Sequence, residues 1–168
     1  MKRKQLFFVT ALALAGPAAY GQETASATAT ATIVTPISIT KDVDMDFGNV
    51  AVQSATGGTA VLTPAGVRTA TGGVTLPTTT GTVTAASFTV TGTDGYTYAI
   101  TLPSTALTIT SAANTMTVSD FTSDPSGTGT LTGGTQTLNV GATLNVGAAQ
   151  PPGVYVSATP FDVTVNYD

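Results

Sequence analysis

Apolar and polar residues alternate along the first part of the chain, from residue 25 to residue 47. The apolar set occupies odd positions with hardly a break: Ala25, Ala27, Ala29, Ala31, Ile33, Ile37, Ile39, Val43, Met45 and Phe47. Successive side chains of a β-strand point to opposite faces, so this pattern predicts extended backbone rather than an amphipathic helix. Pro36 divides the run, because proline cannot donate to a strand ladder. We therefore predict an N-terminal arm over residues 22–35, with its strand pattern starting at Ala25, and a strand over residues 37–46.

The alternation continues through the rest of the chain, interrupted by turn residues. Two hairpins are predicted, one around Pro64-Ala65-Gly66 and one around Gly92-Thr93-Asp94-Gly95, because such residues between alternating strands favour tight turns. Residues 123–134 are rich in Gly, Ser and Thr and predict a surface loop. Further strands are predicted at residues 107–109, 116–118, 138–146, 154–157 and 161–167. Frequent short strands without helix signals indicate an all-β sandwich or barrel.

The N-terminus has the pattern of a secretory signal peptide. Lys2, Arg3 and Lys4 precede an apolar stretch over residues 6–16, and the small residues Ala19 and Gly21 suit a cleavage site. The apolar stretch is too short for a hydrocarbon layer of roughly 30 Å. We therefore predict a signal peptide over residues 1–21, a single exported domain over residues 22–168, and no membrane span after cleavage.

Charge and composition exclude several functions. Beyond residue 21 the chain has two cations, Lys41 and Arg68, and nine acids, which gives a net charge of −7. Binding of a phosphate backbone needs several cationic contacts, so nucleic acid is not an expected partner. The sequence has no histidine and no cysteine, which removes histidine-based triads, cysteine nucleophiles and the common zinc sites. We predict no enzymatic activity and no cofactor.

Two groups of side chains allow a binding role but also a simpler explanation. Asp42, Asp44 and Asp46 alternate on one strand face, where three carboxylates suit calcium, although solvation of an outer face is the better interpretation. They are weak candidates, and no metal site is predicted. The tyrosines suit a sugar-binding surface, but strand spacing favours packing roles for them. These are Tyr96, Tyr98, Tyr155 and Tyr167.

Several motifs carry a resemblance to a known family. They are the run over residues 39–50 ending in Met45-Asp46-Phe47-Gly48-Asn49-Val50, the turn Thr63-Pro64-Ala65-Gly66, the segment Phe88-Thr89-Val90-Thr91-Gly92, and the terminal Phe161-Asp162-Val163-Thr164-Val165-Asn166-Tyr167. Together they resemble the domain-of-unknown-function family 4402 over nearly all of the mature chain. That family is exported by Gram-negative bacteria and is similar to the spore coat protein U group, which includes pilins of archaic chaperone-usher fimbriae. The present chain departs from that group in having no cysteine.

The resemblance implies an immunoglobulin-like antiparallel β-sandwich that lacks one strand. In fimbrial subunits the N-terminal arm of a neighbour fills the gap, and a periplasmic chaperone recognises the C-terminal strand. By this resemblance, the arm would use Ala25, Ala27, Ala29, Ala31 and Ile33, and the C-terminal strand would use Phe161, Val163, Val165 and Tyr167.

We therefore expect a non-enzymatic structural or adhesive protein of the periplasm, cell surface or extracellular space of a Gram-negative bacterium. Its partners would be like subunits and a periplasmic chaperone, joined by strand addition. The alternative is a self-complete extracellular module that binds glycans or proteins, with the arm pairing inside its own domain.

Overall fold

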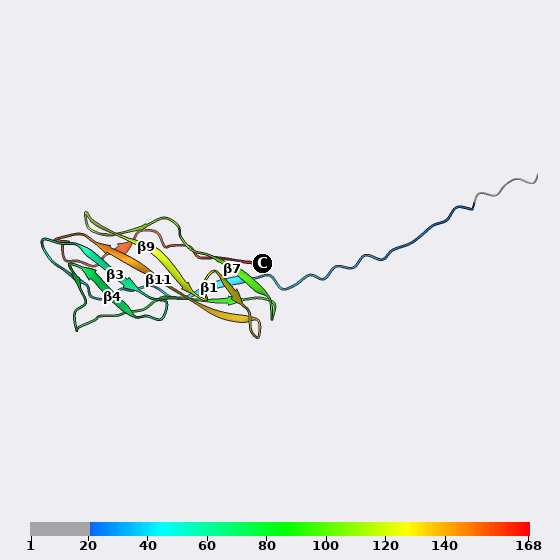
Figure 1. The fold of residues 1–168 in the computed structure, drawn as a ribbon, viewed down its shortest axis with the longest axis horizontal. Helices are drawn as coiled ribbons and strands as arrows, with labels where there is room; N and C mark the ends of the chain where they lie inside the picture. Colours follow the sequence, from blue (N-terminus) through cyan, green and yellow to red (C-terminus); the bar gives the residue numbers. More distant parts are fainter. Residues whose placement is uncertain (1–20) are drawn as a thin grey trace, which may run out of the picture. The chain divides into compact units, whose positions relative to one another are not determined.

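The computed structural model describes residues 21–168, so the predicted signal peptide lies outside the described residues except for Gly21. Two units are distinguished, one ending at Thr32 and one covering Ile33–Asp168. In the first unit, residues 21–32 have no strand or bridge, and all of them are exposed. The second unit contains every strand of the described chain (Figure 1). Nothing in residues 21–168 forms a helix with the length and apolar character needed to cross a membrane.

The larger sheet is antiparallel and has eight strands. Its central strand β11 (Thr135–Val146) has β6 on one side and β9 on the other, and it also pairs with β3 beyond the end of β6 (Figure 1). Every second residue of β11 from Leu138 to Val146 is buried, as the sequence predicted. The remaining strands are β1 (Ser38–Val43), β3 (Gly58–Leu62), β4 (Arg68–Gly72), β6 (Ala86–Thr91), β8 (Leu107–Ser111), β9 (Asn114–Asp124) and β12 (Val156–Ser157).

Two smaller sheets complete the domain. One has the order β10 (Thr128–Thr130), β7 (Thr97–Thr101) and β13 (Thr164–Tyr167), and the other pairs β2 (Ala51–Val52) with β5 (Val74–Thr75). The three-stranded sheet packs over one half of the larger sheet, because Tyr98 and Val165 share a buried cluster with Phe88, Val90 and Leu138. The fold is therefore all-β with sandwich-like packing, as predicted.

A second buried cluster lies over the other half of the larger sheet. It contains Ala60, Val118, Ala142 and Leu144 from three strands of that sheet and Val74 from β5. No residue of β7, β10 or β13 belongs to it among the described residues. The three-stranded sheet thus supplies no side chain to this half of the core.

One of the two predicted hairpins is confirmed, and the other is wrong. Strands β3 and β4 pair across the proline-containing turn, with Thr59 opposite Thr71. By contrast, β6 and β7 were predicted to pair around residues 92–95, yet β6 pairs with β1 and β11, and β7 pairs with β10 and β13. A turn that crosses between two sheets leaves the same alternating pattern as a hairpin, because both strands still bury one face in a shared core.

The loop predicted at residues 123–134 is also wrong. It holds the end of β9, all of β10, and Leu131, which is fully buried. The glycine content misled the prediction, because Gly129 lies opposite Tyr98 in the β10–β7 ladder and a Cβ there would overlap the tyrosine ring. Glycine here provides room for a buried ring rather than freedom for a turn.

Candidate functional site

An apolar groove lies over the part of the larger sheet that the three-stranded sheet does not reach. Its cavity volume is about 1370 Å³. Four adjacent strands of the sheet supply its floor, with Phe88 from β6, Leu144 from β11, Val118 from β9 and Ile109 from β8. We call this cavity the sandwich groove.

Two irregular segments line the sides of the sandwich groove. Residues 43–52 follow β1, and residues 150–157 lead into and include β12. Along the second segment, Val154 is 81% exposed and Val156 is 60% exposed, which is unusual for large apolar side chains at a core. The sequence predicted a strand here but gave no indication that its apolar residues would stay open to solvent.

Two edge strands have a free edge, and one of them, β1, lines the groove at Lys41 and Val43. β1 ends the larger sheet and β13 ends the three-stranded sheet, so each has one edge without a partner strand in the described chain. Residues 158–162 precede β13 and continue the groove wall at Pro160 and Phe161. Outside the strand ladders, no backbone hydrogen bond within the described residues involves them. A free strand edge presents unpaired N–H and C=O groups that another extended segment can pair with.

Apolar and polar residues alternate along the predicted arm as they do in a strand, but the arm does not form a strand. Residues 21–37 have no strand assignment, and Ala25, Ala27, Ala29 and Ala31 are all exposed. Ile33, the largest apolar side chain predicted for strand addition, is 96% exposed. The alternating pattern is therefore not used in any strand pairing of the described chain.

The predicted C-terminal strand is shorter than expected. β13 begins at Thr164, so Phe161 and Val163 precede it, whereas the sequence predicted a strand over residues 161–167. The reason lies in its neighbour, since β7 pairs with β13 only as far as Thr101 opposite Thr164. All four predicted residues still contribute to the first buried cluster, namely Phe161, Val163, Val165 and Tyr167.

Phe161 joins the two halves of the core. Its ring centroid lies 5.0 Å from that of Phe121 and 6.4 Å from that of Phe88, the latter in an edge-to-face arrangement. It also lines the sandwich groove. The residue is therefore held in place by aromatic packing at the point where the groove meets the first cluster.

The three aspartates that were weak metal candidates are not brought together. Asp42 accepts a hydrogen bond from the Thr89 hydroxyl at 2.8 Å, and Asp44 forms an exposed ion pair with Lys41 at 2.7 Å. Asp46 accepts the backbone N–H of Gly48 at 2.7 Å. No group of three acidic side chains in the described residues has a geometry that could hold a metal ion.

The tyrosines do not form a shared sugar-binding surface. Tyr98 is fully buried, and its hydroxyl donates to Oε1 of Gln136 at 2.8 Å. This burial raises the pKa of Tyr98 above its usual value. The Tyr155 hydroxyl donates to the carbonyl of Pro151 and accepts from Gln150, while Tyr96 packs edge-to-face on Tyr167. Packing and internal hydrogen bonds occupy these side chains, as their strand spacing favoured.

One set of contacts at the base of the arm was not visible in the sequence. The Tyr167 hydroxyl accepts the backbone N–H of Thr93 at 2.6 Å and donates to the carbonyl of Thr35 at 2.8 Å. The N–H of Thr35 in turn donates to Oγ1 of Thr93 at 3.0 Å. We call these three residues the Tyr167 latch. It connects the last residue of the arm to the C-terminal strand.

Comparison with known proteins assigns the chain to a family but supplies no characterised relative. No curated protein and no solved structure matches it. A family model described as "Domain of unknown function (DUF4402)" matches residues 37–167, which covers both sheets of the sandwich and all of β13. The chain therefore belongs to the DUF4402 family.

Proposed function

We propose that this protein is an exported, non-enzymatic structural subunit that assembles with copies of itself by strand addition. The arm of one copy enters the sandwich groove of another through the stretch from Ala25 to Ile33, which precedes the fixed residue Thr35. The observation that carries the proposal is the combination of an unfilled apolar groove beside free strand edges with a segment that has strand polarity but no strand partner.

The chemistry of the arm suits that of the groove. In an extended conformation, alanines from Ala25 to Ala31 and then Ile33 face one side, and threonines face the other. The alanine face would lie on the apolar floor, where small side chains allow close approach of the backbone. The threonine face would remain toward solvent.

Most of the binding free energy would come from the backbone. Alanine side chains bury little apolar area, and each contributes little at about 25 cal/mol per Å². Strand addition gains affinity from main-chain hydrogen bonds and specificity from alternate side chains. Nine residues from Ala25 to Ile33 would span about 30 Å at roughly 3.3 Å per residue, which is the length of a long strand.

The proposal extends to partners and location. An open groove of this kind is an aggregation hazard until it is filled, so a chaperone that donates a strand during export would protect it. Passage through the periplasm to the cell surface would follow from the predicted signal peptide. The protein could then serve as a structural or adhesive component of a surface polymer.

The proposal is tested by comparing the mature chain, residues 22–168, with a form that lacks residues 22–32. We expect the mature chain to form chains of subunits in multi-angle light scattering, and the shortened form to be a folded monomer. A peptide with the sequence of residues 22–35 should bind the shortened form and raise its melting temperature. A mature chain that is monomeric, and that unfolds when residues 22–32 are removed, would instead support a self-complete module.

Two matched variants test the face of the arm. Ala29→Asp places a charge on the face proposed to enter the groove, so we expect it to abolish assembly, because a buried unpaired carboxylate is costly. Thr30→Asp places the same charge one residue later, on the opposite face, and should leave assembly largely intact. Equal effects of the two variants would contradict an alternating docked strand.

A further inference from the structure

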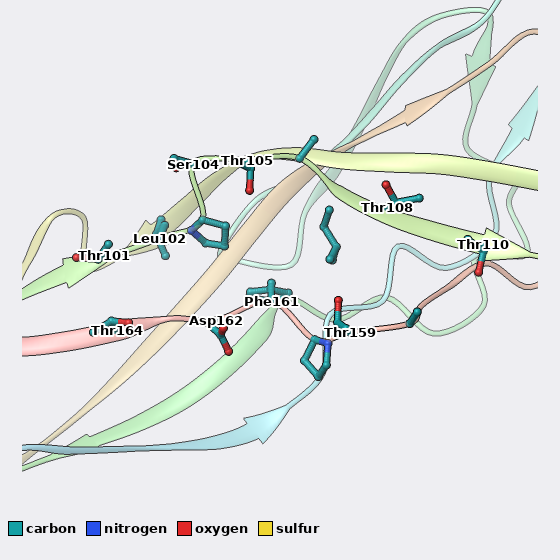
Figure 2. A pocket seen from close by; sticks show the side chains of 15 residues that line it. Thr101, Leu102, Ser104, Thr105, Thr108, Thr110, Thr159, Phe161, Asp162 and Thr164 are labelled. Atoms are coloured by element: carbon teal, nitrogen blue, oxygen red, sulfur yellow. The ribbon is translucent and has the colours of Figure 1, made fainter.

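A second cavity opens where two paired strands separate. β7 and β13 are paired as far as Thr101, which lies opposite Thr164. Beyond this pair of residues the two segments of the chain separate. Residues from 101–110 and 158–164 line a cavity of about 660 Å³ between them (Figure 2). This volume is in the range of small-molecule sites, about 300–1,000 Å³. We call it the fork cavity.

The lining of the fork cavity is rich in hydroxyl groups. Seven of its fifteen lining residues are threonine or serine. Figure 2 shows the hydroxyls of Thr105 and Thr159 directed toward the space between the two segments. Neither hydroxyl has a hydrogen-bond partner elsewhere in the described chain, in contrast to the hydroxyls of Thr59 and Thr71, which bond each other at 2.7 Å.

The backbone on both sides of the cavity is also unpaired. Outside the strand ladders, no backbone hydrogen bond within the described residues involves residues 103–106 or 158–162. Their N–H and C=O groups therefore add donors and acceptors to those of the hydroxyls. Strand pairing would normally satisfy such groups, and here the separation of β7 from β13 leaves them open.

The charge and the apolar surface of the lining residues indicate which class of ligand the fork cavity would accept. The lining contains no lysine or arginine, and its one charged residue is the exposed Asp162. An anion would therefore be disfavoured. The ring of Phe161 and the two prolines Pro103 and Pro160 give apolar surface among the hydroxyls.

We propose that the fork cavity binds a neutral, polyhydroxylated ligand, namely a short segment of an uncharged carbohydrate. Sugar hydroxyls both donate and accept, as threonine hydroxyls do, and the Asp162 carboxylate supplies a further acceptor. The C–H faces of sugar rings would pack on Phe161 and the prolines. This site is separate from the tyrosines considered above, and it shares Leu107, Pro160 and Phe161 with the sandwich groove.

The proposal is tested by titrating the mature chain with neutral hexasaccharides of glucose, mannose, xylose and N-acetylglucosamine in a calorimeter. We expect at least one of these probes to bind, and we expect amide hydrogen exchange on that complex to show protection confined to residues 101–110 and 158–164. The double variant Thr105→Val/Thr159→Val should weaken binding about tenfold, the loss expected for two neutral hydrogen bonds. Both positions are exposed, so neither substitution removes buried packing.

The matched control is Thr69→Val/Thr137→Val, which removes two exposed strand hydroxyls outside the fork cavity. This control should bind the probe like the unmodified chain. The proposal is overturned if none of the four probes binds, if protection maps outside the two segments, or if the Thr105/Thr159 variant binds as tightly as the control.

Discussion

The hydroxyl of Tyr167 donates a hydrogen bond to the carbonyl oxygen of Thr35 across 132 residues of chain, at a distance of 2.8 Å. Through the same hydroxyl it accepts the N–H of Thr93 at 2.6 Å. The second-to-last residue of the protein thus holds the last residue of the arm against the turn between β6 and β7. Residues 22–34 precede this fixed point, so the Tyr167 latch sets the position from which the arm can pair with another strand.

The Tyr167 latch is expected to contribute to stability. Tyr167→Phe keeps the ring on Tyr96 but removes two hydrogen bonds, which should lower the free energy of unfolding by about 1–2 kcal/mol. For a domain of this size, the melting temperature should fall by roughly 3–8 °C. Thermal unfolding followed by circular dichroism measures the change.

The control for Tyr167→Phe is Tyr96→Phe. It removes a hydroxyl that has no hydrogen-bond partner in the described chain from the other ring of the same aromatic pair. Its melting temperature should stay near that of the unmodified protein. If both variants lose the same stability, the latch hydrogen bonds contribute nothing and only ring packing matters.

Gly129 is expected to be intolerant of any side chain. A Cβ at this position would overlap the ring of Tyr98, which is fully buried and cannot move outward. Overpacking of this kind typically costs about 1–3 kcal/mol, so Gly129→Ala should shift the urea midpoint clearly downward. Gly147→Ala is the control, because a Cβ there would meet only the flexible end of Gln150, at 3.2 Å. A Gly129→Ala protein as stable as this control would show that Tyr98 can be repacked.

The sequence predicted the strands that bury one face, because their apolar and polar residues alternate. β11 was expected because Leu138, Val140, Ala142 and Leu144 alternate, and the structure buries all four. Pairing partners were harder to predict, since the strands on either side of residues 92–95 bury their faces in the same core from different sheets. Local alternation reports which side chains are buried and carries little information on which strand lies alongside.

The candidate sites are formed by contacts between residues that are distant in sequence, and the alternation within a single segment does not predict such contacts. The arm was predicted because its alternation is continuous, but the sandwich groove consists of residues from seven separated stretches, including Phe88, Ile109 and Val154. The Tyr167 latch joins three residues that lie far apart in sequence. The fork cavity exists only because β7 ends at Thr101, while β13 starts at Thr164. Each site is thus a product of tertiary arrangement.

Stability should fall at high pH because of Tyr98. Burial raises the pKa of its hydroxyl in the folded state, so the folded protein holds this proton more tightly than the unfolded chain does. Stability from this source is complete below the unfolded pKa of about 10 and is lost as the pH rises through the folded pKa. Urea unfolding between about pH 8 and pH 12 should show this decline.

The variant Tyr98→Phe isolates that effect. It removes the Tyr98 hydroxyl and leaves every other ionisable group of the chain in place. The difference in unfolding free energy between the unmodified protein and Tyr98→Phe should therefore shrink as the pH rises above about 10. A difference that stays constant across the range would mean that Tyr98 ionises equally in the folded and unfolded states.

Arg68 and Lys41, the two cations beyond the predicted signal peptide, should differ sharply in their importance. The guanidinium of Arg68, on β4, donates to the carbonyl oxygens of Phe47 and Asn49, the latter at 2.9 Å, and both of these residues line the sandwich groove. Arg68→Met keeps much of the apolar stem but leaves both carbonyls without this donor. We expect a loss of about 1–3 kcal/mol in unfolding free energy, and weaker binding of the arm peptide because one groove wall is loosened.

Lys41→Met is the matched substitution. Lys41 pairs only with Asp44, and the two side chains are 55% and 81% exposed, so solvent screening should reduce the cost to below about 0.5 kcal/mol. Urea unfolding of both variants compares the two contributions to stability. Titration of the arm peptide is used only for the Arg68 variants, because Lys41 itself lines the sandwich groove. Arg68→Lys adds a finer test, because Nη1 of the guanidinium donates to both carbonyls and a shorter lysine would have to bring its own nitrogen to the same point. If Arg68→Lys matches the unmodified protein in both measurements, then any positively charged donor near residue 47 is enough and the guanidinium itself is not needed to hold the groove wall.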